Sequence, residues 1–124
     1  MTATTGSATK IAEAYVRAWM TGDVETAMTY IADDITCEAP SGPISGRDGY
    51  RRFLAPFASS LDGGQLTDVL GDDVHAAAVY IVDTPFAKDF RGMEYLTVEN
   101  GKITRAVTLF DRAPIIAAQA ASQG

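Results

Sequence analysis

Four polar side chains in this 124-residue chain are the candidates for acid–base chemistry: Asp83, Tyr15, His75 and Asp111. Asp83 ends the apolar run 78–82. If it points into a cavity, loss of water raises its pKa and makes it a usable base. The alternative is that Asp83 caps the turn that follows, as aspartates commonly do. The sequence leaves both alternatives open.

The other three candidates also have two interpretations each. Tyr15 lies on the apolar stripe of a predicted helix, where its phenol could donate to a substrate oxygen or bond to the backbone of the core. His75 is the only histidine and could shuttle protons, or it could be exposed beside residues 72–73, which are both aspartates. Asp111 could assist catalysis or form a salt bridge with Arg91 or Arg112.

A hairpin over residues 93–111 is the element most firmly predicted to position these groups. Asn100-Gly101 separates two runs of β-branched and aromatic residues, and this pair favours a type I′ turn because both central residues need positive φ. One face of the hairpin is expected to meet the first and third helices and to line a pocket. The expected lining residues are Trp19, Phe53, Phe57, Met93, Tyr95, Thr108 and Phe110.

Helical and strand periodicities predict the order of the remaining elements. Helices are expected over 9–22, after Asp23 and over about 48–61, and strands over 35–39, 65–70 and 74–83. Residues 40–46 read as a loop, and the tail 113–124 as a weak helix or disorder. This order predicts an α+β fold in which a cone-shaped, curved antiparallel sheet packs on three N-terminal helices. One domain is expected over 1–124, with its core at about 9–112.

Charge and composition narrow the range of partners. The formal net charge of −6 argues against nucleic acid and against an anionic membrane surface, since both attract basic patches. One cysteine and one histidine predict no metal site and no internal disulfide. A cytoplasmic location is expected. Apolar residues on the expected outer face, Val98, Val107 and Leu109, predict a homodimer.

The chain resembles the nuclear transport factor 2-like superfamily over about residues 9–112, and within it the SnoaL-like and ketosteroid-isomerase-like proteins. The residues that carry the resemblance are Tyr15-Val16 to Gly22-Asp23, Ala32-Asp33-Asp34, Gly46-Arg47-Asp48, Asn100-Gly101-Lys102-Ile103 and Phe110-Asp111. The resemblance implies the cystatin-like cone. It does not select one chemistry, because this fold hosts isomerases, dehydratases, cyclases, epoxide hydrolases and non-catalytic modules.

In the resemblance to ketosteroid isomerases, Tyr15 matches the tyrosine of the oxyanion hole. The general-base aspartate of that family falls on Ala39, and its second oxyanion-hole acid falls on Met93. Two of the three groups are therefore missing, which argues against steroid isomerisation by that mechanism.

The resemblance to limonene epoxide hydrolases places one of their aspartates on Asp83. Their arginine falls on Ile81 and their second aspartate near Thr108, so that triad is incomplete too. In SnoaL-like aldol cyclases an aspartate works with a histidine, and Asp111 and His75 have the right types.

The prediction is therefore a cofactor-independent enzyme that acts on a hydrophobic polycyclic or terpenoid ligand by proton transfer or water addition. It would be an isomerase, cyclase or epoxide hydrolase, with Asp83 as base, Tyr15 as oxyanion donor and His75 or Asp111 as auxiliary groups. The alternative is a non-catalytic module for small-molecule binding or dimerisation, which the missing acids at positions 39 and 93 favour.

Overall fold

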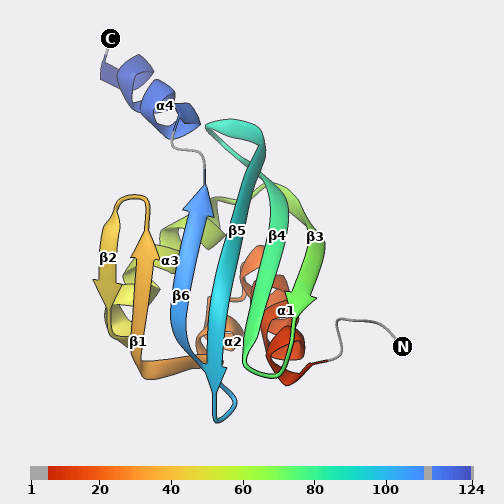
Figure 1. Cartoon of the computed structure of the whole chain (residues 1–124). Coiled ribbons are helices and arrows are strands. Elements are labelled where there is room, and N and C mark those ends of the chain that lie inside the picture. The colour runs from red at the N-terminus through yellow and green to blue at the C-terminus, as the bar shows by residue number, and fades with distance from the viewer. Residues whose placement is uncertain (1–5, 111–112, 124) are drawn as a thin grey trace.

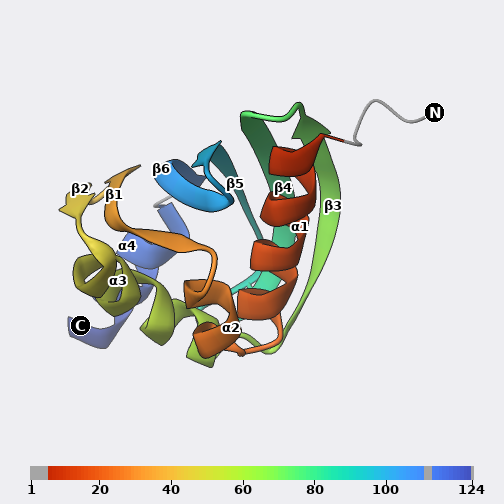
Figure 2. The same cartoon turned by 90° about the horizontal axis from the view of Figure 1, so that it is seen from below.

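The computed structural model describes residues 6–110 and 113–123 and shows a curved six-stranded sheet with helices on its concave side (Figures 1 and 2). The α+β prediction is confirmed. The helices are α1 (Ser7–Met20), α2 (Val24–Met28), α3 (Arg47–Ser60) and α4 (Ala113–Gln123). The strands are β1 (Ile31–Ala39), β2 (Gly42–Ser45), β3 (Gly63–Gly71), β4 (His75–Thr84), β5 (Ala87–Glu99) and β6 (Lys102–Phe110), in the spatial order β2-β1-β6-β5-β4-β3.

The helices begin and end where the sequence offers caps and apolar stripes. The carboxylate of Asp23 accepts a hydrogen bond from the amide of Thr26 at 3.1 Å, which caps α2 as predicted. The buried stripe of α1, which includes Tyr15 and Trp19, packs against the inner face of the sheet. None of the helices within 6–110 and 113–123 has the length and apolar character needed to cross a membrane.

Two features of the sheet differ from the prediction. β1 begins at Ile31 and runs parallel to β6, so the sheet is mixed rather than wholly antiparallel. The expected loop 40–46 contains β2, which carries Pro43 at the edge of the sheet, where a missing N–H costs no ladder bond. Outside the sheet, the tail forms the helix α4, which was one of the two predicted alternatives.

The hairpin of β5 and β6 contains a bulge that decides which side chains face inward. Asn100 and Gly101 have φ of 52° and 77°, as a type I′ turn requires, so the predicted turn is confirmed. Val98 pairs with Ile103, but Thr97 pairs with Arg105, which leaves Thr104 without a partner on β5. This extra residue shifts the register by one beyond the turn. Glu94, and not its neighbour Met93, therefore lies opposite Thr108.

Alternation in burial identifies the inner face of β4 and β5, which the sequence left open. The inner face of β4 carries Ala76, Ala78, Tyr80 and Val82, and that of β5 carries Phe90, Gly92, Glu94, Leu96 and Val98. Val98 was predicted to lie on the outer face; it is 6% exposed and belongs to the core. Val107 and Leu109 do lie on the outer face, beside Tyr95.

Candidate functional site

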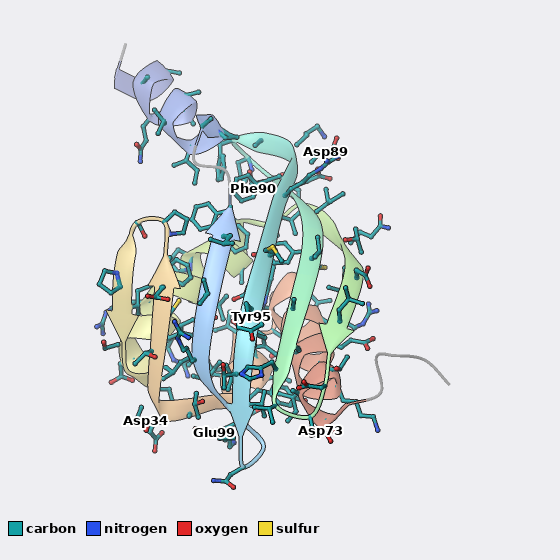
Figure 3. The ribbon with its side chains drawn as sticks, viewed as in Figure 1. Asp34, Asp73, Asp89, Phe90, Tyr95 and Glu99 are labelled. Atoms are coloured by element: carbon teal, nitrogen blue, oxygen red, sulfur yellow. The ribbon has the colours of Figure 1, made fainter. Side chains whose placement is uncertain are left out.

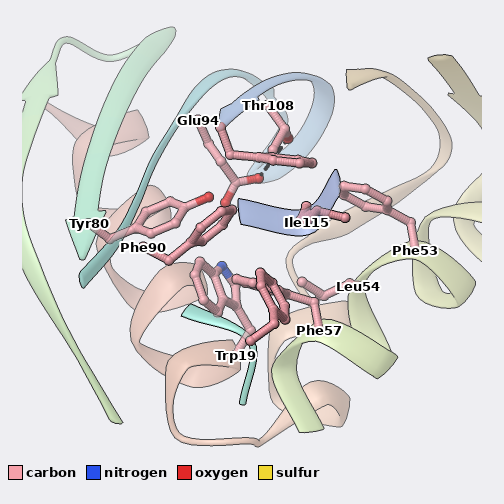
Figure 4. A pocket seen from close by; sticks show the side chains of 11 residues that line it. Trp19, Phe53, Leu54, Phe57, Tyr80, Phe90, Glu94, Thr108 and Ile115 are labelled. Atoms are coloured by element: carbon pink, nitrogen blue, oxygen red, sulfur yellow. Dashed lines mark hydrogen bonds between the residues drawn. The ribbon is translucent and has the colours of Figure 1, made fainter. Parts of the chain in front are cut away.

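An apolar cavity of about 120 Å³ lies between the helices and the inner face of β4, β5 and β6 (Figure 4). Aromatic rings from five elements meet around it because each of these elements turns its apolar face inward. Ile115 of α4 also reaches the cavity, so the C-terminal helix forms part of its wall. The lining residues are Trp19, Phe53, Leu54, Phe57, Tyr80, Phe86, Phe90, Glu94, Thr108, Phe110 and Ile115.

Glu94 is the only carboxyl among the described residues that line this cavity. Its side chain is 3% exposed and comes from the middle of β5. One carboxylate oxygen, Oε2, accepts hydrogen bonds from the hydroxyls of Tyr50 and Thr108, each at 3.2 Å (Figure 4 draws the bond to Thr108). Two donors on one oxygen fix the orientation of the Glu94 carboxyl. The Glu94 side chain also forms part of the cavity wall.

Burial controls the proton affinity of Glu94. Loss of water raises the pKa of this carboxyl to about 7, and the hydroxyls of Tyr50 and Thr108 oppose that rise because they stabilise the charged form. The nearby indole N–H of Trp19 also lowers the pKa, although it does not reach hydrogen-bond geometry. At neutral pH both protonation states of Glu94 are populated, which is the condition for a general acid or base.

Tyr15 and Tyr50 extend this network behind the cavity. Their hydroxyls are hydrogen-bonded to each other, both side chains are fully buried, and their ring centroids lie 6.5 Å apart. Burial and then the charge of Glu94 raise the pKa of both phenols well above their ordinary value, so both remain protonated donors. Tyr15 does not line the cavity, and it reaches Glu94 only through Tyr50.

We expect Tyr50→Phe to raise the pKa of Glu94 further, because it removes a donor to the charged carboxylate. Tyr15→Phe should raise it less, since Tyr15 does not touch the carboxyl. A ¹³C NMR titration of the Glu94 carboxyl carbon measures both effects, and Tyr95→Phe is a matched control on the outer face. Equal pKa values in the Tyr50→Phe variant and the parent protein would contradict this network.

Five of the seven predicted ligand-binding residues lie around the cavity: Trp19, Phe53, Phe57, Thr108 and Phe110. Met93 and Tyr95 do not, and here the prediction is corrected. They lie on the outer face of β5, where Tyr95 is 42% exposed. The bulge at Thr104 of β6 explains the difference, because it pairs Thr108 with Glu94, whereas an uninterrupted hairpin pairs Thr108 with Met93.

Asp83 and His75 lie on the outer face of β4, away from the cavity. The half-buried Asp83 carboxylate accepts a hydrogen bond from the amide of Asp89 at 3.0 Å, so it orders the β4–β5 turn. The His75 ring stacks on that of Tyr95, with centroids 5.5 Å apart and planes 6° from parallel (Figure 3 labels Tyr95). Asp111 lies outside the described residues.

Sequence reasoning missed Glu94, Tyr50 and Tyr80. A signal for Glu94 was present: it interrupts an otherwise apolar alternation that runs from Phe90 to Val98. A charge inside an apolar face is more informative than any apolar residue, because charges are seldom buried without a reason. Tyr50 and Tyr80 gave no comparable signal, since tyrosines are common in ordinary cores.

Comparisons with known proteins agree with this architecture. The family model of the SnoaL-like domain matches residues 12–106. A crystal structure of a protein from Kribbella flavida DSM 17836 is similar to this chain at 38% identity and a TM-score of 0.89, and the match covers 92% of this chain and 94% of that one. Among curated proteins, no match to the sequence was found.

Two more distant structures share the fold. One is a ketosteroid isomerase-like protein from the same Kribbella strain, with 24% identity, a TM-score of 0.73 and coverage of 86% of this chain and 79% of that one. The other is a polyketide cyclase-like protein from Xanthomonas campestris pv. campestris, with 24% identity, a TM-score of 0.71 and coverage of 90% and 95%. At these identities the likeness concerns the fold.

Proposed function

Because this chain belongs to the SnoaL-like domain family, whose cone encloses the cavity described above, we propose that it is a cofactor-independent enzyme that moves a proton on a small hydrophobic ligand. The observation that carries the proposal is Glu94, a buried carboxyl in an apolar cavity with a pKa of about 7. Glu94 takes the role of base that the sequence suggested for Asp83.

The chemistry that suits one such carboxyl is proton transfer at a carbon next to a carbonyl group. The Glu94 carboxylate removes a hydrogen from that carbon as a proton, and the electron pair of the C–H bond moves into an enolate whose charge lies on oxygen. Protonated Glu94 then returns the proton to the same carbon or to another. An isomerase or a cyclase uses these steps. Epoxide hydrolysis with two carboxylates and an arginine is less suited, since the described lining holds one carboxyl and no arginine.

The size of the cavity favours a ligand with one ring. A closed apolar cavity of about 150 Å³ accommodates benzene. This cavity has a similar volume, about 120 Å³, and is partly open, so a ring can fill it while a short substituent extends toward the opening. A single planar ring with a short carbonyl substituent matches that space and the aromatic walls better than a polycyclic skeleton does.

Solvent exchange tests the proposal directly. Single-ring ketones such as acetophenone are incubated with the protein in D₂O, and ¹H NMR follows the replacement of the hydrogens next to the carbonyl by deuterium. We expect exchange faster than with buffer alone for at least one ketone in the panel. Binding of ketones without any exchange would contradict catalysis.

That second result would support the alternative function, a binding module of the same fold. The feature that favours this alternative is the lack of a second acid or base beside Glu94 in the described lining. A binding module would retain the ligand and leave its hydrogens unexchanged.

We also propose a homodimer formed through the outer face of the sheet. Tyr95 and Leu109 are 42% and 53% exposed there, beside Val107 and Met93. A sheet with two apolar faces needs a cover on each side, and helices cover only the inner one. A second copy of the same uncharged patch fits, because twofold symmetry pairs a patch with itself.

Leu109→Asp is expected to shift the protein from dimer to monomer, because it places a charge in the middle of that patch. Light scattering after gel filtration should give twice the 13.2 kDa chain mass for the parent protein and one chain mass for the variant. Ile116→Asp is the control, since Ile116 is equally exposed but lies on α4. A monomeric parent protein would refute the dimer.

A further inference from the structure

The cavity contains a buried donor that makes no hydrogen bond, although the Glu94 carboxyl lies near it. The Trp19 side chain is 1% exposed and lines the cavity, and its Nε1–H has no hydrogen-bond partner. An unsatisfied buried polar group is costly, and native proteins contain few of them. Such a group at the wall of a cavity is explained if a ligand supplies the missing acceptor.

A second unused donor lies next to the first. Tyr80 is 3% exposed and lines the cavity, and within the described part of the chain its hydroxyl makes no hydrogen bond. Its ring meets that of Trp19 edge to face, with centroids 4.9 Å apart and an interplanar angle of 82°. In Figure 4 the Tyr80 hydroxyl and the Trp19 nitrogen both point toward the space beside the Glu94 carboxyl.

Gly92 makes room for the Tyr80 ring in this position. It pairs with Tyr80 across β4 and β5. A Cβ atom at Gly92 would lie 2.7 Å from the Tyr80 ring and 2.8 Å from its hydroxyl oxygen, closer than such atoms approach each other. The Tyr80 ring therefore lies directly over a residue without a side chain, which keeps its hydroxyl at the cavity.

We propose that the Trp19 N–H and the Tyr80 hydroxyl together bind the carbonyl oxygen of the ligand, beside Glu94. This inference rests on the proposed function and specifies its substrate class: single-ring compounds with a carbonyl oxygen and a removable hydrogen on the adjacent carbon. Charge that develops on the oxygen when Glu94 takes the proton then meets two fixed donors in an enclosed site. The assignment replaces Tyr15, whose hydroxyl is bonded to Tyr50.

Aromatic rings and a carboxylate could also bind a cationic ligand. The unpaired N–H of Trp19 argues against that class. Aromatic faces and an anion attract ammonium groups, and no lysine, arginine or histidine belongs to the described lining. An ammonium group, however, has no lone pair and leaves the Trp19 N–H without an acceptor. An oxygen atom satisfies both donors.

Two ligands of the same shape test the inference. Acetophenone and α-methylstyrene differ only in whether oxygen or a CH₂ group is attached to the central carbon. Ligand-observed NMR titration measures the dissociation constant of each. For two neutral hydrogen bonds we expect the parent protein to prefer acetophenone by roughly 5- to 100-fold. Trp19→Phe and Tyr80→Phe should each remove a several-fold part of that preference, and the double variant should show almost none.

Binding of α-methylstyrene to every variant shows that the cavity has survived the substitution, and Tyr95→Phe, on the outer face, is the matched control. An unchanged preference in the double variant overturns the inference. So does a parent protein that binds neither ligand, or one that binds benzyltrimethylammonium more tightly than acetophenone. If the preference depends on the two donors but no ketone exchanges its hydrogens, the proposed catalysis fails while this binding site stands.

Discussion

Glu94→Gln is expected to lower the rate of ketone hydrogen exchange by at least about 100-fold, the lower end of what general acid–base catalysis contributes. Glutamine keeps the shape of glutamate and still accepts hydrogen bonds from Tyr50 and Thr108, but it can neither take up nor release a proton in this reaction. The measurement is the initial rate of deuterium incorporation by ¹H NMR at pH 7, near the pKa of Glu94. Ligand binding should persist, because the aromatic walls and the two unused donors are untouched.

Glu99→Gln is the matched control. It makes the same chemical change on the same strand, at an exposed position outside the cavity. Its exchange rate should equal that of the parent protein. A Glu94→Gln variant that retains the parent rate would show that Glu94 is not the base.

Glu94→Gln is also expected to stabilise the protein at alkaline pH. The folded-state pKa of Glu94 is about 7, above the ordinary value of 4.5, so between these two pH values the folded state binds more protons than the unfolded state. The stability of the parent protein therefore falls as pH rises from 4.5 to 7, and above pH 7 the full cost of the buried charge is present. A difference of this size corresponds to about 3 kcal/mol. Glutamine, which never ionises, avoids this cost.

Urea unfolding at pH 4 and pH 8 measures this effect. At pH 4 Glu94 is protonated in the folded state and mostly protonated in the unfolded state, so Glu94→Gln should change the free energy of unfolding little. At pH 8 the variant should be more stable than the parent protein, by about 3 kcal/mol. Glu99→Gln should show no such pH-dependent gain. An equal effect of Glu94→Gln at both pH values would contradict a raised pKa. The prediction also implies that the parent protein retains a destabilising carboxyl in its core, as functional sites often do.

Local signals predicted the parts of the fold that depend on neighbouring residues. The Asn100-Gly101 turn, the Asp23 cap and the apolar stripe with Trp19 each follow from a few adjacent positions, and the structure confirms all three elements. The order of the elements predicted the curved sheet, and the family resemblance implied the same cone. The strand face of Thr108 and Phe110 was also identified, since it follows from simple alternation along β6.

Local signals could not decide which face of β4 and which face of β5 points toward the cavity. Both faces of β4 are apolar, and only packing against α1 decides that Tyr80 points inward and Asp83 outward. On β5, counting back from a two-residue turn pairs Met93 with Thr108, whereas the structure pairs Glu94 with it. The sequence around Thr104 does not predict the extra residue that shifts this pairing, because a bulge needs no diagnostic side chain at this position.

The bulge at Thr104 has a consequence for related proteins as well. The single unpaired position at Thr104 works as a spacer on β6 that selects whether the hydroxyl of Thr108 or the isopropyl group of Val107 lies opposite Glu94. Closing that bulge would exchange these two side chains, and with them remove one of the hydrogen-bond donors to Glu94, without a substitution among the cavity residues. In proteins of this shape, a change in reactivity can therefore arise from a shift in strand register, and alignments that slide past such a position without a gap will pair the wrong neighbours.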